Sequence, residues 1–160
     1  MSFTHLHLLL NHFPVIGAII GVVLLGIAVL RRSSELGKVS FGLLAALGVI
    51  SIIVYFTGEP AQDSIEKLPG FSKSITEEHE EFALVATIGL AVIGAFTLSA
   101  LAVFRRKPFP RWLTITGLVL AIGASGLMGY TALLGGQVRH TEIRSGVTQP
   151  SAPDARDSDN

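Results

Sequence analysis

The chain has 160 residues, of which 49% are hydrophobic and only 15% charged, whereas a soluble domain carries about a quarter charged residues. The charges gather between long uncharged stretches, which is typical of an integral membrane protein. The net charge is zero, so no nucleic-acid partner is expected. The lack of cysteine excludes disulfides, thiolate-held iron–sulfur clusters and thiol nucleophiles in this chain.

Four apolar segments predict four transmembrane helices. Each has about 18–23 uncharged residues, enough to cross a hydrocarbon core of about 30 Å. The first is expected to be a retained helix rather than a signal peptide, because no basic residue precedes its long apolar run. The second is expected to end at Gly58 and Pro60, and the fourth at Gly135-Gly136, since Gly and Pro commonly end helices. The predicted helices cover about residues 5–30, 39–57, 76–104 and 111–135.

The connections between these helices predict the orientation. Those at 31–38 and 105–111 carry seven basic residues and one acidic residue, whereas the segment 59–81 carries seven acidic residues and two lysines. Basic connections stay in the cytoplasm. We therefore expect an all-α, four-helix bundle in a bacterial inner membrane, running up-down-up-down, with both termini periplasmic. Residues 1–140 would form this domain, and the polar residues 141–160 a mobile tail.

Small residues recur every four positions along the predicted helices. Gly17 and Gly21 form one such pair, and Ala121, Ser125 and Gly129 form another series. Small residues let helix backbones approach closely in lipid. The pattern favours tight packing within the bundle over a dimer motif.

The predicted orientation places all five histidines on the outer side. At 1.5 Å per residue, His7 stands about 36 Å above Arg31, and His79 about 39 Å above Arg105. His5 reaches a similar height, and so would His140 if the chain folds back after the fourth helix. His12 would lie lower, just inside the hydrocarbon, at about the height of Tyr130.

Proline 14 can act on this end of the bundle in two ways. Its ring crowds the carbonyl of Leu10 and removes a hydrogen bond, so it can kink the first helix outward and widen the bundle near His12. Alternatively, the helix begins late and Pro14 occupies its first turn, where proline is harmless. His5 and His7 would then lie on an extended lead-in.

Imidazoles from opposing helices at one height favour a haem with two histidine ligands, for which four-helix bundles commonly provide a site. His79 with His5 or His7 is the first expected pair, followed by His12 and His140. A competing interpretation is an interfacial copper, iron or zinc site. Its ligands would come from the four upper histidines together with Glu78 or Glu81: His5, His7, His79, His140.

Two further interpretations concern the lower histidine and the acidic run. His12 and Tyr130 could hydrogen-bond a quinone carbonyl, or His12 could simply bond Tyr130 or a freed backbone carbonyl. The four glutamates within residues 77–81 could have no role beyond complementing the dipole of their helix, with Ser74 and Glu77 forming a capping box. The histidines could equally be solvated at the interface.

Four stretches resemble a group of small bacterial four-helix membrane proteins of unknown function: HLHLLLNHFPVIG from residue 5, TGEPAQDSIEKLPG from 57, EEHEEFA from 77 and LLGGQVRHTEIR from 133. The resemblance extends from His5 to about Arg144. That group is similar in layout to b-type cytochromes, and related modules occur joined to Rieske iron–sulfur domains. The resemblance implies membrane electron transfer through haem. Its motif positions are His5, His7, His12, Glu59, His79, Glu81 and His140.

These observations together predict an electron-transfer subunit that binds haem b, or a related metal centre, on the periplasmic side. It would pass electrons between a quinol pool and an external acceptor, with other redox subunits as partners. The alternative is a non-enzymatic scaffold or accessory subunit of a respiratory or photosynthetic membrane complex. No Ser-His-Asp arrangement or phosphate loop suggests a hydrolase or an ATPase.

Overall fold

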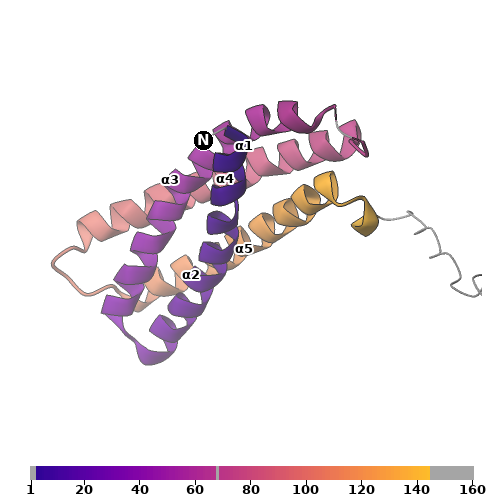
Figure 1. The fold of residues 1–160 in the computed structure, drawn as a ribbon. Coiled ribbons are helices and arrows are strands. Elements are labelled where there is room, and N and C mark those ends of the chain that lie inside the picture. The colour runs from indigo at the N-terminus through magenta and orange to yellow at the C-terminus, as the bar shows by residue number, and fades with distance from the viewer. Residues whose placement is uncertain (1–2, 68, 145–160) are drawn as a thin grey trace, which may run out of the picture.

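The computed structural model describes residues 3–67 and 69–144, and every regular element in this part of the chain is helical. Figure 1 shows a bundle of long helices preceded by one short helix. In chain order the elements are α1 (Phe3–Leu10), α2 (His12–Arg31), α3 (Ser34–Ile65), α4 (Lys73–Val103), α5 (Arg111–Arg139) and the 3₁₀ turn η1 (Thr141–Ile143).

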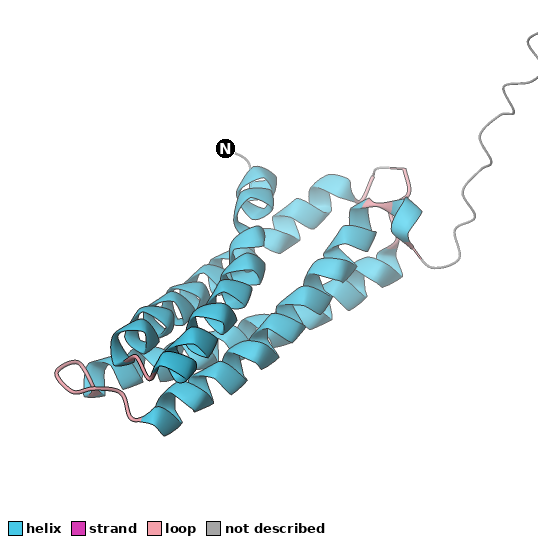
Figure 2. Cartoon of the chain, turned by 90° about the horizontal axis from the view of Figure 1, so that it is seen from below, coloured by secondary structure: helices cyan, strands magenta, loops and turns pink. Residues whose placement is uncertain are grey.

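The long helices α2 to α5 close into a ring. Each packs against the next one along the chain, and α5 returns to pack against α2. The short helix α1 packs against α3. Its other contacts are with α2. Figure 2 shows the long helices running side by side, with α1 set apart at one end.

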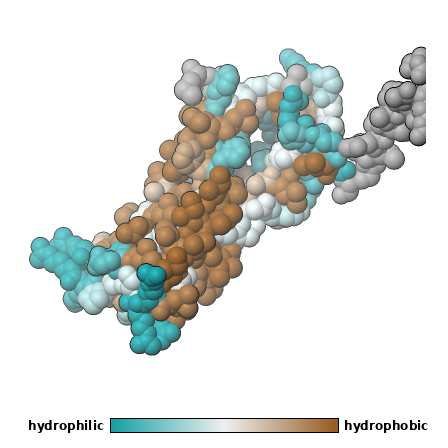
Figure 3. Space-filling view, turned by 60° about the horizontal axis from the view of Figure 1, so that its bottom comes forward, coloured by the Kyte–Doolittle hydropathy of each residue, from teal (hydrophilic) through white to brown (hydrophobic). Residues whose placement is uncertain are grey.

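Four helical stretches are long and apolar enough to cross a membrane: Phe3–Arg31, Ser34–Ile65, Lys73–Val103 and Arg111–Arg139. Many large apolar side chains point outward, including Leu30, Phe56 and Val103, which are at least 70% exposed. Figure 3 shows this hydrophobic surface as a band between two hydrophilic ends. In a membrane, lipid chains rather than water would contact this band, as expected for a membrane protein.

The interior is packed from apolar side chains and glycines. Phe41 is fully buried and packs against Phe109, with ring centroids 4.9 Å apart and the ring planes tilted by 58°. Its ring lies directly on Gly117, which leaves no room for a side chain there. Gly48 and Gly94 bring α3 and α4 into backbone contact, since a Cβ on Gly48 would lie 3.1 Å from the Cα of Gly94.

The small residues of α2 serve this internal packing. Gly17 and Gly21 are buried and face Leu47 and Leu44 of α3. The members of the series on α5 do not all pack inside the bundle. Ala121 is buried, whereas Gly129 is exposed and a Cβ there would meet no atom within 4 Å. The GxxxG pair is therefore part of the α2–α3 contact.

Two helices continue past the glycines that were expected to end them. Helix α3 runs through Gly58 and Pro60 to Ile65, and α5 runs through Gly135 to Arg139. In α3 the extra turns are supported by α1, whose Thr4 hydroxyl lies 2.8 Å from that of Ser64. Tertiary packing thus overrides the weak local preference of Gly and Pro to end the helix.

The first predicted helix is divided at Asn11. The backbone of Asn11 stays helical and its N–H donates to the carbonyl of His7, so the chain bends without unwinding. Pro14 is the third residue of α2, where it deprives the carbonyl of Leu10 of its helical donor. The chain bends here, as the first interpretation of Pro14 expected, whereas Pro14 itself lies in the first turn of a helix that begins at His12, as the second expected. His5 and His7 lie on helix α1 rather than on an extended lead-in.

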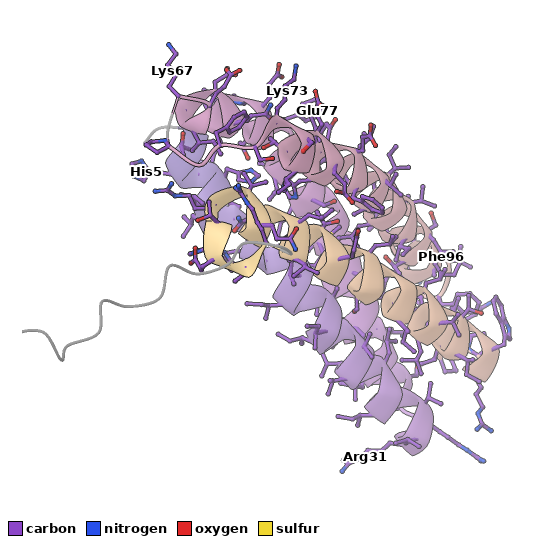
Figure 4. The ribbon with its side chains drawn as sticks, turned by 90° about the vertical axis from the view of Figure 1, so that its right-hand side faces the viewer. His5, Arg31, Lys67, Lys73, Glu77 and Phe96 are labelled. Carbon is purple, nitrogen blue, oxygen red and sulfur yellow. The ribbon has the colours of Figure 1, made fainter. Side chains whose placement is uncertain are left out.

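The connections gather at opposite ends of the bundle. Figure 4 shows Arg31 at one end and His5, Lys67, Lys73 and Glu77 at the other. We call the first the basic end (residues 31–38 and 104–111) and the second the histidine end (residues 3–12, 58–81 and 131–144). The expected capping box is not formed, because the N-cap of α4 is Ser72.

The chain after α5 is docked at least as far as Arg144. The guanidinium of Arg144 donates to the carbonyls of Gln137 and Val138 at the end of α5, and to that of Gly70 in the α3–α4 connection. Residues 141–144, which the sequence assigned to a mobile tail, are therefore tied to the bundle. The rest of that predicted tail, residues 145–160, lies outside the described part of the chain.

Candidate cofactor site

His7 is held against α3 through one ring nitrogen. Its Nδ1 lies 3.1 Å from the carbonyl oxygen of Val54, which also accepts a 2.8 Å hydrogen bond from the Thr57 hydroxyl. The ring rests beside Gly58, where a Cβ would be 3.5 Å from the Cε1 atom of His7. The α1–α3 contact therefore fixes the imidazole in place.

His79 is held against α5 in the same manner. Its Nδ1 lies 3.1 Å from the carbonyl oxygen of Thr131. The ring lies on Gly135, where a Cβ would be 3.0 Å from the Cε1 atom of His79. The hydroxyl of Thr131 is occupied separately, since it donates to the carbonyl of Leu127.

The two sites share one construction. In each, a histidine on one helix donates to a carbonyl on a neighbouring helix, and a glycine stands four residues after that carbonyl. Residues four apart are neighbours on a helix face, so a side chain in place of the glycine would stand beside the carbonyl and the ring. On Gly135 a Cβ would crowd the ring of His79, whereas on Gly58 it would reach only ordinary contact with His7. Gly135 thus provides clearance for imidazole rather than a helix end.

These contacts determine the tautomer of both rings. A backbone carbonyl can only accept, so the proton is on Nδ1, and in the neutral imidazole the lone pair is then on Nε2. Within residues 3–67 and 69–144, neither Nε2 has a hydrogen-bond partner. Metal-ligating histidines commonly use this arrangement, in which the second nitrogen is anchored to a carbonyl and ring orientation is fixed.

His7 and His79 lie at the same end of the bundle although their helices do not contact each other. No Cα of α1 lies within 8 Å of a Cα of α4 or α5, and the two imidazoles are anchored instead to α3 and α5. The bend at Asn11 produces this separation by turning α1 towards α3. Figure 3 shows the surface hollowed at this end, with hydrophilic residues in the hollow.

A buried polar atom lies one turn from His7. The side-chain oxygen of Asn11 is buried without a hydrogen-bond partner among the described residues. An unpaired buried acceptor costs about 1–3 kcal/mol. An unpaired acceptor at the bend is expected if a bound group donates a hydrogen bond to it.

The other three histidines are exposed, unlike this pair. His5 lies on α1, and His12 is the first residue of α2. His140 follows α5, and its Nδ1 lies 2.8 Å from a carboxylate oxygen of Glu142. His12 and His140 thus lie at the histidine end without the carbonyl-anchored geometry of His7 and His79.

The predicted carboxylate and phenol residues make different contacts. The Tyr130 hydroxyl donates to Glu78 at 3.3 Å rather than to His12, and its ring packs edge-on against Phe82. Glu78 and Glu81 are both exposed. Among the described residues no three histidine, aspartate or glutamate side chains are grouped so as to hold a metal ion. The expected mixed histidine–carboxylate set is therefore not assembled there.

The sequence identified both histidines of the pair but not what orients them. Val54 and Thr131 contribute backbone carbonyls, which carry no sequence signature, and Gly58 and Gly135 were interpreted as helix ends. The spacing of Gly58 and Gly135 from the nearest threonine did not indicate a histidine contact in the sequence. No protein-family model, curated protein or solved structure matches the chain.

Proposed function

We propose that this protein is an electron-transfer subunit of a bacterial inner membrane that binds haem b through Nε2 of His7 and His79. One observation carries the proposal: two imidazoles from different helices, at the same end of the bundle, are each anchored through Nδ1 to a carbonyl, so that each Nε2 lone pair remains available. A bis-histidine haem requires this combination.

The number of available ligands favours haem over a bare metal ion. Structural zinc sites use four protein ligands and catalytic ones three, whereas the described residues offer His7 and His79 without a third ligand. A haem supplies its own four equatorial nitrogens and needs the protein only for the axial positions. A site with two histidines therefore suits haem better than copper(II), iron or zinc alone.

Two features of the histidine end support a bound group. Helix α1 has no Cα within 8 Å of a Cα of α4 or α5. The buried side-chain oxygen of Asn11, one turn from His7, has no partner among the described residues and would accept a hydrogen bond from such a group. When bound, the haem would supply one-electron chemistry, while the chain orients the ligands and surrounds them with apolar helices.

We further propose that the helices run up-down-up-down with the basic end in the cytoplasm. The support is the clustering of Arg and Lys at one end of the bundle and of acidic residues at the other. Both termini and the proposed haem would then face the periplasm. The chain has no soluble redox domain in its described part, so electrons would pass to a quinone and to partner subunits.

Absorption spectroscopy of the purified protein tests the haem proposal. We expect a Soret band that shifts on reduction, lost in His79→Ala and in His7→Ala. The matched control is His12→Ala, which removes an exposed histidine of the same end and should leave the band intact. Absence of haem with stoichiometric copper, iron or zinc would replace haem by a metal site, and absence of both would leave a scaffold subunit.

A pair of reporter fusions tests the orientation separately. Alkaline phosphatase fused after Glu66 should be active, and the same fusion after Arg106 inactive, because only periplasmic fusions gain activity. The reverse result would contradict the proposed topology without affecting the ligand assignment.

A further inference from the structure

A cavity lies at the basic end, far from the histidine pair. It has a volume of about 120 Å³ and lies where α2 ends and where α3 and α5 begin. This volume is several times what one water molecule needs. Its polar lining consists of Arg32, Ser33 and Ser34 from the α2–α3 connection, and Arg111 and Thr114 from α5.

The lining is positively charged and contains no acid. Arg32 and Arg111 are both exposed, and within the described part of the chain neither forms an ion pair with a carboxylate. Glu35 is the one acidic residue of the basic end and does not line the cavity. Two guanidinium groups therefore meet at one cavity with their donors available.

The serines add donors of the same polarity. The Ser33 oxygen accepts from the backbone N–H of Leu36, and the Ser34 oxygen accepts from that of Phe109. Each hydroxyl can still donate its own hydrogen. The first turns of α3 and α5 begin at this cavity, so the positive ends of their dipoles reinforce the field of the arginines.

We propose that this cavity binds a phosphate group, supplied by the headgroup of an anionic phospholipid. Guanidinium groups bind phosphate through paired hydrogen bonds, and helix N-termini favour it further. The lipid is the expected source because the cavity borders the apolar band. Leu30, which follows the lining residue Val29, is 85% exposed, and Trp112, which follows the lining residue Arg111, is 61% exposed. Acyl chains can lie on both side chains while the phosphate enters the cavity.

Trp112 is the only tryptophan of the chain, so its fluorescence reports on this site alone. The full-length protein in a neutral detergent would be titrated with brominated phosphatidylglycerol and, separately, with brominated phosphatidylcholine. We expect half-maximal quenching at a concentration at least tenfold lower for the anionic lipid. Equal quenching by the two lipids would overturn the proposal.

Matched charge variants separate a site from general attraction. Removing the cavity charges in Arg32→Gln/Arg111→Gln should reduce the preference for the anionic lipid about tenfold. Arg31→Gln/Arg106→Gln removes the same charge from the same end but outside the cavity, and should retain most of the preference. An equal loss in both variants would show that only the general charge of this end matters, and would refute the site.

Two further measurements complete the test. Inorganic phosphate that displaces the lipid at millimolar concentration would indicate that the site also takes free phosphate, whereas lack of displacement would assign it to the lipid. If Arg32→Gln/Arg111→Gln is unstable, Arg32→Lys/Arg111→Lys is used in its place, because this variant keeps the positive charge. Lysine lacks the paired donors of arginine, so a several-fold weaker preference is expected. An unchanged preference would contradict binding through the guanidinium groups.

Discussion

The imidazole of His79 lies on Gly135, so closely that a Cβ there would be 3.0 Å from Cε1 and 3.4 Å from Nδ1. Replacing Gly135 by Ala should therefore push the ring aside and lengthen its hydrogen bond to Thr131. We expect the fixed Nδ1–H tautomer of His79 to become a mixture. Nitrogen-15 NMR of the histidine rings measures this directly, whether or not a cofactor is bound.

The control for this change is Gly129→Ala on the same helix, where a Cβ would meet no atom within 4 Å. Both variants gain about 1 kcal/mol of helix propensity, so this contribution cancels between them. The control should leave the His79 signals unchanged. An unaltered tautomer in Gly135→Ala would mean that the glycine contact does not position the ring.

The backbone contact between α3 and α4 gives a second prediction. A side chain on Gly48 would lie 2.9 Å from the carbonyl oxygen of Leu90, and backbone atoms cannot move aside as a side chain can. Gly48→Val should therefore force the helices apart and destabilise the protein by about 1–3 kcal/mol. Unfolding in sodium dodecyl sulfate mixed micelles measures the loss. Gly42→Val, on the open face of α3, is the control and should cost much less.

Arg144 joins the end of α5 to the α3–α4 connection through three hydrogen bonds to carbonyls. Arg144→Gln should release that connection, because bonds from a charged donor contribute about 1.5–3 kcal/mol each. Trypsin should then cleave after Lys67 or Lys73 about tenfold faster. Arg139→Gln removes an exposed charge nearby and should leave the rate unchanged. Equal cleavage rates in the two variants would show that Arg144 does not hold the connection.

The turn after α5 should respond to acid through Glu142. Its pKa is lowered from the ordinary value of 4.5, first by a hydrogen bond from its own backbone N–H and then by the His140 side chain. A group whose pKa is lowered on folding stabilises the structure above its unfolded pKa and loses this effect as the pH falls through the folded value. Docking of η1 should therefore weaken below about pH 4.5.

Amide hydrogen exchange at Ile143 and Arg144 measures that docking as a function of pH. Glu142→Gln cannot ionise, so its exchange rates should lack the acid-dependent step after the intrinsic pH dependence is removed. The same step in both proteins would assign it to another group.

At the histidine end, local sequence patterns were not sufficient to predict where two helices end. Gly58 and Pro60 predicted a helix end, but contacts with α1 carry α3 on to Ile65. Gly135 was likewise interpreted as a terminator, although its role is to make room for His79. A glycine signals only the absence of a side chain, and whether that ends a helix or admits a neighbour depends on what lies opposite.

The sequence by itself determined that four apolar helices are connected by charged segments, because hydropathy over 18 or more residues depends on composition and not on contacts. It also placed His7 and His79 at one level, since the rise per residue of a helix is constant. Only the tertiary structure decided that these two rings, and not His12 or His140, share one anchored geometry. Their orientation depends on backbone carbonyls and on the bend at Asn11, which arise from packing between helices distant in the sequence.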